Sequence, residues 1–354
     1  MTRQLSRRGP RWPWSWLPHQ HRHRGQTSRR ARRRLRLLGA GSLALVLLLV
    51  TTVALLVGRD GGTPEPGTPE AGTPETVSCA RYGLEDVRVT ARGPGGPTDA
   101  AVLDARVFGP GEQRQDRFRL EHEHGGITSS YHVLADGLDW DRPVGVVYHF
   151  HGDGAFEYEN PQYTASCLAE VAREHNMMLV VPRTPDRAGE ITWWEERDLN
   201  ARWFLSLVEE RLEPEYDIDR SRTWLTGYSG GAQFISQELL ADHLDLVPGG
   251  GAIMMGGGQA PDSPAAEPTR EQLQDLRLRW DVGTEDDGTD PQARFNALSA
   301  AWDGHRWYEE QGFERARIRY RDGVDHFGLP YARILQRALD AAEEDAQEDA
   351  QDAS

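Results

Sequence analysis

The chain has 354 residues, with 40 Lys+Arg against 56 Asp+Glu and a formal net charge of −16. That length allows one large domain or two average ones. Residues 1–36 hold twelve arginines and no acidic residue, which leaves 28 arginines against 56 acidic residues in residues 37–354. The net charge of that larger part is therefore −28, and such an acidic surface argues against a nucleic-acid partner.

Residues 37–57 form an uncharged, mostly apolar run of 21 residues. As a helix this run spans roughly 31 Å, about the thickness of a bilayer's hydrocarbon core. The arginines before it place residues 1–36 in the cytoplasm as a basic tail, so we expect a transmembrane signal anchor with the rest of the chain outside the cell membrane. The alternative is a secreted protein, but residues 53–58 offer no clear small-x-small cleavage site.

Three Gly-Thr-Pro-Glu repeats occupy residues 58–76. Proline and like charges keep such a segment extended, which predicts a stalk. At the other end, residues 341–354 form an acidic, alanine-rich tail that can continue the last helix before it frays. We expect residues 77–340 between them to fold as one globular domain.

The two cysteines, Cys79 and Cys167, both follow the predicted anchor. In an oxidising compartment an even pair indicates a disulfide bond, here between the start of the domain and a predicted helix. Two unrelated buried thiols are the alternative.

Short strand-like runs separated by glycine and proline fill residues 84–134 and predict an antiparallel strand set. The runs cover residues 87–91, 101–108, 117–121 and 130–134. His122 and His124 alternate within Glu121-His122-Glu123-His124, directly after the third run, and so face the same side of a strand. A metal site is one interpretation, but no third ligand is apparent, so we expect a solvated strand face.

From residue 144 onward, continuous apolar runs alternate with helical patterns. The strand-like runs are 144–150, 177–182, 223–226, 249–255, 276–282 and 316–320, and the helical patterns are 161–175, 199–212, 232–242, 291–311 and a last helix from about 330. Continuous apolar runs are typical of strands buried on both faces. The alternation predicts an α/β fold with a mostly parallel central sheet and helices on both faces.

A Gly-x-Ser-x-Gly motif joins the strand-like run 223–226 to a helical pattern. Ser229 stands at its centre, at the tip of a strained strand-to-helix turn that projects a hydroxyl away from the sheet. Gly227 and Gly231 leave room for close packing, and Gly230 can offer its backbone N–H to a developing oxyanion. The motif also occurs by chance in chains with as many as 37 glycines, but the flanking strand and helix favour a nucleophile.

His151-Gly152-Asp153 directly follows the apolar run 144–150. A turn at this position lies opposite the Ser229 turn, so Gly152 and Asp153 are candidates for the second half of an oxyanion hole. The alternative is an ordinary glycine turn.

A histidine and an acid follow Ser229 in the order expected of a hydrolase triad. His326 is the only histidine after the last predicted strand, on a loop from which it can take the serine proton. Asp286 follows the run 276–282 and is our candidate for the acid that orients the histidine. Asp287 and Asp281 remain open for that role.

These motifs resemble the α/β-hydrolase superfamily from about residue 130 to 340. The likeness is to secreted esterases of the polyhydroxybutyrate-depolymerase and feruloyl-esterase kind. It rests on His151-Gly152, Asp219-Arg220, Gly227-Tyr228-Ser229-Gly230-Gly231, Gly283-Thr284-Glu285-Asp286 and Asp325-His326. The resemblance implies ester hydrolysis through an acyl-serine intermediate, without metal or organic cofactor. Asp153 departs from the family pattern, because a small or neutral residue is common there.

The expected site is fairly open, because the 20 residues between Met255 and Leu276 leave no space for a large cap domain. Trp193 and Trp194 either line the substrate cleft or pack beneath it. We therefore expect a membrane-anchored serine carboxylesterase for small-molecule or polymeric esters. The alternatives are a peptidase or an acyltransferase on the same triad, or a binding module that has lost activity.

Overall fold

A computed structural model describes residues 76–93, 114–186 and 191–352. The predicted basic tail, the predicted membrane span 37–57, all of the stalk except residue 76, and the predicted strand 101–108 lie outside these ranges. Within them, no helix combines the length and apolar character that a membrane crossing requires.

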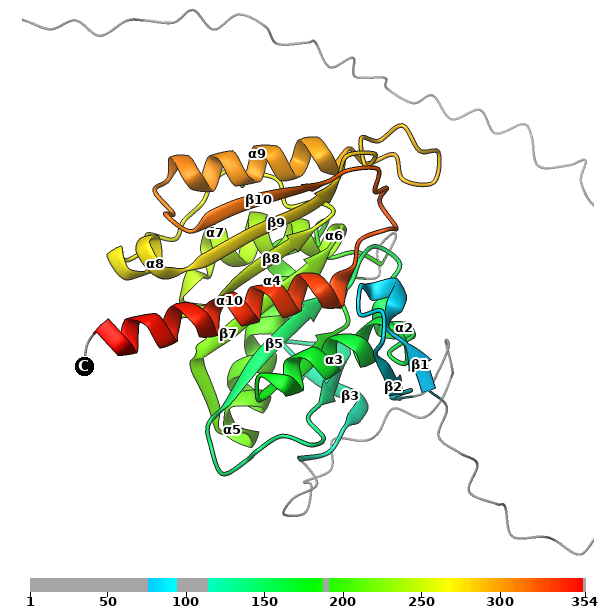
Figure 1. Cartoon of the computed structure of the whole chain (residues 1–354), viewed down its shortest axis with the longest axis vertical. Helices are drawn as coiled ribbons and strands as arrows, with labels where there is room; N and C mark the ends of the chain where they lie inside the picture. The colour runs from blue at the N-terminus through cyan, green and yellow to red at the C-terminus, as the bar shows by residue number, and fades with distance from the viewer. Residues whose placement is uncertain (1–75, 94–113, 187–190, 353–354) are drawn as a thin grey trace, which may run out of the picture. The chain divides into compact units, whose positions relative to one another are not determined.

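An eight-stranded sheet lies at the centre of the described chain (Figure 1), in the order β10-β9-β8-β7-β5-β6-β4-β3. Its strands are β3 (Arg117–His124), β4 (Ile127–Leu134), β5 (Val144–Phe150), β6 (Met177–Pro182), β7 (Ile218–Tyr228), β8 (Gly251–Met255), β9 (Arg277–Gly283) and β10 (Ala316–Arg321). β4 runs antiparallel to both β3 and β6, and every other neighbouring pair is parallel. This mostly parallel sheet fits the α/β-hydrolase fold that the sequence predicts.

Helices cover both faces of the sheet. They are α2 (Phe156–Glu159), α3 (Thr164–Glu174), α4 (Arg197–Leu207), α5 (Glu213–Glu215), α6 (Gly230–Phe234), α7 (Leu240–Asp242), α8 (Arg270–Asp275), α9 (Ala297–Glu310) and α10 (Tyr331–Asp352), with π-helical turns η3 (Val208–Leu212) and η4 (Ile235–Leu239). One apolar cluster joins α3 and α10 to the sheet, and a second joins α4, α6 and α9 to its other face. Every residue of β5, β6 and β8 is therefore buried.

Several helix bounds differ from the sequence-based expectation. The pattern 291–311 becomes α9 only from Ala297, because Asn296 caps the helix by accepting the N–H of Ser299 at 2.8 Å. α8 was not predicted, although Thr269 and Gln272 form a capping box at its start. α10 continues to Asp352, so most of the acidic tail is helical.

A small N-terminal unit is bound covalently to the sheet layer. It contains β1 (Thr76–Ser78), the 3-10 turn η1 (Ala80–Tyr82) and β2 (Arg88–Thr90), and β1 pairs antiparallel with β2. Cys79 and Cys167 form the disulfide that the sequence predicts, with Cα atoms 5.7 Å apart and a sequence separation of 88. The bond joins the start of the domain to α3.

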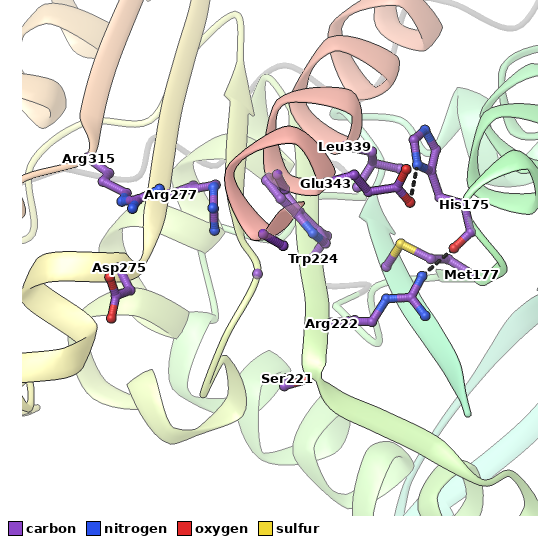
Figure 2. Close-up of a pocket in the computed structure, with 13 residues that line it drawn as sticks. His175, Met177, Ser221, Arg222, Trp224, Asp275, Arg277, Arg315, Leu339 and Glu343 are labelled. Carbon is purple, nitrogen blue, oxygen red and sulfur yellow. Dashed lines mark hydrogen bonds and ion pairs between the residues drawn. The ribbon is translucent and has the colours of Figure 1, made fainter. Parts of the chain in front are cut away.

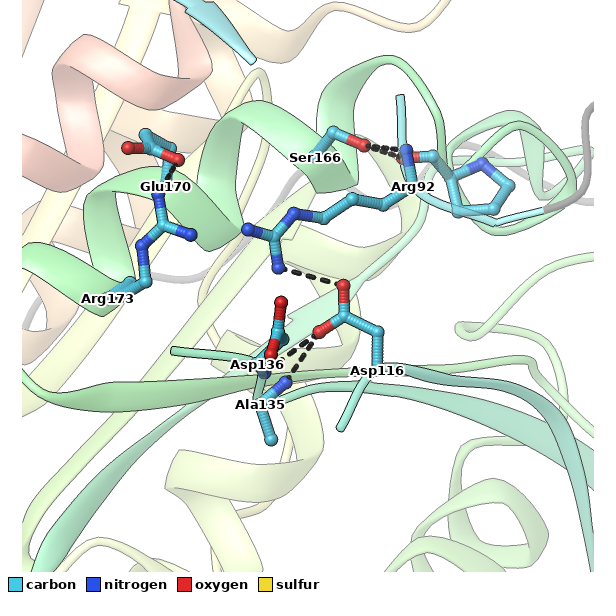
Figure 3. A network of polar contacts seen from close by, with 8 residues as sticks. Arg92, Asp116, Ala135, Asp136, Ser166, Glu170 and Arg173 are labelled. Atoms are coloured by element: carbon cyan, nitrogen blue, oxygen red, sulfur yellow. Dashed lines mark hydrogen bonds and ion pairs between the residues drawn. The ribbon is translucent and has the colours of Figure 1, made fainter. Parts of the chain in front are cut away.

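A polar network adds a second connection (Figure 3). The Oδ2 atom of Asp116 pairs with Arg92 at 2.8 Å, and its Oδ1 atom accepts the backbone N–H groups of Ala135 and Asp136. The backbone N–H of Arg92 donates to the hydroxyl of Ser166 on α3 at 3.1 Å. One carboxylate thus ties together the end of β2, the start of β3, the end of β4 and, through Arg92, α3.

The two histidines of β3 do not share a solvated face, so that expectation is wrong. His122 is 4% exposed, and its Nε2 atom lies 2.9 Å from the hydroxyl of Ser206. His124 is exposed and pairs with Glu210 at 3.0 Å. The structure differs because α4 and η3 pack over β3, which the strand pattern alone does not reveal. No cluster of metal-binding side chains occurs within the described ranges.

Candidate active site

Ser229 lies at the sharp turn from β7 into α6. Its backbone has φ 51° and ψ −113°, a left-handed conformation that is strained for a residue with a side chain. A Cβ atom on Gly227 would lie 2.6 Å from the carbonyl carbon of Gly231, and one on Gly231 would lie 2.2 Å from the carbonyl oxygen of Phe150. Both outer glycines of the motif are therefore required by close backbone packing.

Three polar side chains form a hydrogen-bonded row at this turn. The Oγ atom of Ser229 lies 3.0 Å from Nε2 of His326, and Nδ1 of His326 lies 2.8 Å from Oδ2 of Asp286. Their exposed fractions are 9% for Ser229, 8% for His326 and 2% for Asp286. A carboxylate at Nδ1 places the ring proton there, which leaves Nε2 free to accept the serine proton.

The two alternative acids point elsewhere. The carboxylate of Asp287 accepts hydrogen bonds from the backbone and hydroxyl of Thr289. Asp281 is bound by the guanidinium of Arg321 at 2.6 Å and 2.7 Å. Burial raises the pKa of Asp281, and the charge of Arg321 opposes that shift. Neither carboxylate contacts His326, whereas Asp286 does.

Tyr228 holds the histidine loop from below, a role that the sequence did not indicate. Its hydroxyl donates to the backbone carbonyl of His326 at 2.9 Å, and the two rings lie 4.9 Å apart. The tyrosine ring also packs against Gly152, where a Cβ atom would approach it to 2.7 Å. Tyr228 lies between Gly227 and Ser229 in the motif. Its side chain supports the loop that carries His326.

The turn after β5 supplies only part of the predicted oxyanion hole. The backbone N–H of Gly152 donates to the carboxylate of Glu157 at 3.1 Å, so this donor is already engaged. Among the described residues, no hydrogen-bond acceptor contacts the backbone N–H of Asp153 or that of Gly230 at the start of α6. These two groups are the available donors of the predicted set.

Glu157 is a buried carboxyl group that the sequence analysis missed. It is 4% exposed, and burial raises its pKa, while the N–H groups of Glu157 and Gly152 act in the opposite direction. It follows Ala155, which has a φ of 58°, and so belongs to a tightly folded turn. Glu157 fixes the backbone from which Asp153 projects.

The two tryptophans have different environments. Trp193 is fully buried and packs against Phe150 and Phe234 beneath the site. Trp194 is 42% exposed, and its indole N–H donates to Oδ2 of Asp153 at 3.1 Å. Trp193 therefore packs beneath the hydrogen-bonded row, and the lining of a substrate cleft by Trp194 stays a prediction.

A cavity of about 350 Å³ lies at the other end of the sheet (Figure 2), where α10 crosses the amino ends of the parallel strands. Two of its lining residues, Glu343 and His175, pair with each other at 2.8 Å, and a third, Arg277, pairs with Asp345 of α10 at 2.8 Å. Ser229, Asp286 and His326 instead follow the carboxyl ends of β7, β9 and β10. This cavity is separate from the hydrogen-bonded row.

No protein-family model matches the sequence, and no curated protein matches it. Among solved structures, a thermostable esterase is similar at 16% identity and TM-score 0.44, covering 64% of this chain and 62% of that one. A poly(aspartic acid) hydrolase from Sphingomonas sp. KT-1 is 13% identical and has a TM-score of 0.44. That match covers 64% of this chain and 98% of the hydrolase chain. A feruloyl esterase module from Clostridium thermocellum is 14% identical and has a TM-score of 0.42. That match covers 71% of this chain and 94% of the esterase module. These likenesses carry no assignment of activity.

Proposed function

We propose that this chain is a serine hydrolase, and specifically a carboxylesterase with Ser229 as its nucleophile. The observation that supports the proposal is the unbroken row of hydrogen bonds from Ser229 through His326 to the buried Asp286. A serine hydroxyl is a weak nucleophile, and a neighbouring base oriented by a third group is the arrangement that activates it.

In the proposed reaction, Nε2 of His326 takes the hydroxyl proton as Oγ of Ser229 attacks the acyl carbon. Asp286 accepts the hydrogen bond from Nδ1–H and stabilises the imidazolium that forms. The backbone N–H groups of Gly230 and Asp153 donate to the oxyanion. His326 then protonates the departing alcohol, and water attacks the acyl-serine with His326 again as the base.

The test is hydrolysis of a p-nitrophenyl ester series from acetate to palmitate, with a matched anilide, by the full chain purified in detergent. We expect ester turnover that falls by at least about 10³-fold in Ser229→Ala. Ser299→Ala, which changes an exposed serine on α9, serves as the control. Ester hydrolysis that persists in Ser229→Ala would contradict the proposal. Turnover of the anilide alone would indicate a peptidase, and turnover only with an added alcohol would indicate an acyltransferase.

We also propose that residues 37–57 anchor the chain in the cell membrane with residues 77–340 outside. The uncharged run of 21 residues, the preceding arginines and the disulfide between Cys79 and Cys167 support this location. We expect the full-length chain to be found in the membrane fraction. We also expect protease added to intact cells to remove a tag placed at the C-terminus. A protein in the medium that lacks residues 1–57 would instead establish secretion after cleavage.

A further inference from the structure

A carboxylate lies directly beside the proposed oxyanion donor Gly230. A Cβ atom on Gly230 would lie only 2.1 Å from Oδ1 of Asp153 and 3.1 Å from Cδ1 of Trp194. Any side chain at position 230 would therefore collide with Asp153. The carboxylate of Asp153 therefore lies next to the turn that carries Ser229. The resemblance to esterases leads us to expect a small or neutral residue at position 153.

The Asp153 carboxylate is held in place by Trp194. The indole N–H donates to Oδ2 at 3.1 Å, which leaves Oδ1 toward Gly230. Both residues are exposed, so their outer surfaces face the side from which a substrate reaches Ser229. Among the described residues, no arginine or histidine forms an ion pair with Asp153.

This placement has an electrostatic consequence for ester hydrolysis. A tetrahedral intermediate carries negative charge at the N–H groups of Gly230 and Asp153, and a fixed carboxylate beside it opposes that charge. Glu195 and Glu196, which directly follow Trp194 in the chain, are also exposed. A substrate that brings its own positive charge to Asp153 removes the opposition, whereas an anionic substrate increases it.

We propose that Asp153 and Trp194 form a subsite for a cation, and that the enzyme acts on esters that carry an alkylammonium group. The proposal rests on the proposed esterase function. A carboxylate supplies the charge that an ammonium group requires, and an exposed indole attracts a quaternary ammonium through its π face. The cationic group belongs either to the acyl part or to the alcohol part of the ester.

Two matched pairs of esters test the proposal and distinguish these two placements. The first pair is acetylcholine and its uncharged analogue, in which a quaternary carbon replaces the nitrogen. The second pair is the p-nitrophenyl ester of trimethylammoniobutanoate and its uncharged carbon analogue. p-Nitrophenyl hemisuccinate serves as an anionic substrate, and the full chain in detergent is used throughout.

We expect kcat/KM for the cationic member of at least one pair to exceed that for its neutral analogue by about tenfold or more, and the hemisuccinate to be the poorest substrate. In Asp153→Asn the cationic-to-neutral ratio should fall to about one, since the backbone donors remain and the charge is lost. Trp194→Phe, which keeps an aromatic ring but loses the N–H, should lower the ratio by a smaller factor. Asp198→Asn removes one exposed charge on α4 and should retain the wild-type ratio.

Equal kcat/KM for cationic and neutral members of both pairs would overturn the subsite while leaving the esterase intact. A preference that survives in Asp153→Asn would overturn the role of Asp153. Absence of Ser229-dependent hydrolysis of every ester would instead contradict the proposed function, and the subsite with it.

Discussion

At the scale of single residues, His326 is held from three directions. Asp286 accepts a hydrogen bond from its Nδ1–H, Ser229 lies at its Nε2 atom, and the hydroxyl of Tyr228 donates to its backbone carbonyl. The first two contacts define the proposed chemistry. The third fixes the loop on which the ring is mounted, and a general base must be positioned closely to be effective.

Removing the loop contact should therefore slow the reaction without preventing substrate binding. We predict that Tyr228→Phe lowers kcat by about tenfold with little change in KM, because the ring still packs while the hydrogen bond to the histidine loop is lost. Steady-state kinetics on folded protein measures both constants. Tyr320→Phe, an exposed tyrosine on β10, is the matched control and should behave as wild type. An unchanged kcat in Tyr228→Phe would show that the loop needs no such support.

The identity of the acid is tested by two neighbouring substitutions of the same kind. We predict that Asp286→Asn lowers kcat by about 10⁴-fold, because the histidine loses the partner that selects its tautomer. Asp287→Asn should have little effect, because that carboxylate bonds only to Thr289. Comparable losses in both variants, or a larger loss in Asp287→Asn, would contradict the assignment.

The sequence favoured Asp286 as the acid but left Asp287 and Asp281 open. Residues 286 and 287 are both compatible with the motif, and only the path of the turn decides which side chain points at His326. The same limit applies to Gly152, whose N–H is engaged by a glutamate five residues later. Motifs specify which residue types are available, whereas hydrogen-bond partners depend on packing.

At the scale of elements, the buried strands were the most predictable. β5 and β6 have the bounds expected from their apolar runs, because a strand buried on both faces is a nearly continuous apolar segment with a clear start and end. The environment of β3 was not predicted correctly, because α4 covers the face of this strand that carries His122. The start of α9 was misplaced because Pro291 looks like a helix start, whereas the chain first turns through a bridge between Asp290 and Ala293.

A buried histidine in β4 makes the stability of this layer depend on pH. Nδ1 of His132 accepts the backbone N–H of Arg119, and Nε2 donates to the carbonyl of Tyr158, both at 2.9 Å. Burial lowers the pKa of His132 to about 4. The unfolded chain therefore takes up the proton first, so the contribution of His132 is complete above about pH 6.5 and is lost as the pH falls toward 4.

We predict that this histidine accounts for about 2 kcal/mol of the free energy of unfolding lost between about pH 7.5 and about pH 5. Denaturant titrations at both pH values measure the difference. His132→Asn cannot titrate in this range and should reduce the difference by that amount, whatever its effect at neutral pH. His124→Asn changes an exposed histidine and should retain the wild-type difference. A variant His132→Asn with an undiminished pH dependence would contradict the prediction.

At the scale of the whole molecule, the parallel sheet assembles the site from distant parts of the sequence. Asp153, Ser229, Asp286 and His326 follow β5, β7, β9 and β10, and all four strands end at the same edge. The strand order was not deduced from the sequence, but the expectation of a mostly parallel sheet was enough to place these residues together. The cavity under α10 lies at the opposite edge, where its lining includes three arginines, Arg222, Arg277 and Arg315.

The most direct test of Ser229 as the nucleophile is labelling of the full chain with a fluorophosphonate, followed by mass spectrometry of its peptides. We predict that the label is found on Ser229, and that His326→Ala greatly slows its attachment because the hydroxyl is no longer activated. A folded protein that takes no label at Ser229, or takes it equally fast without His326, would contradict the central claim that this row of side chains is a working nucleophile.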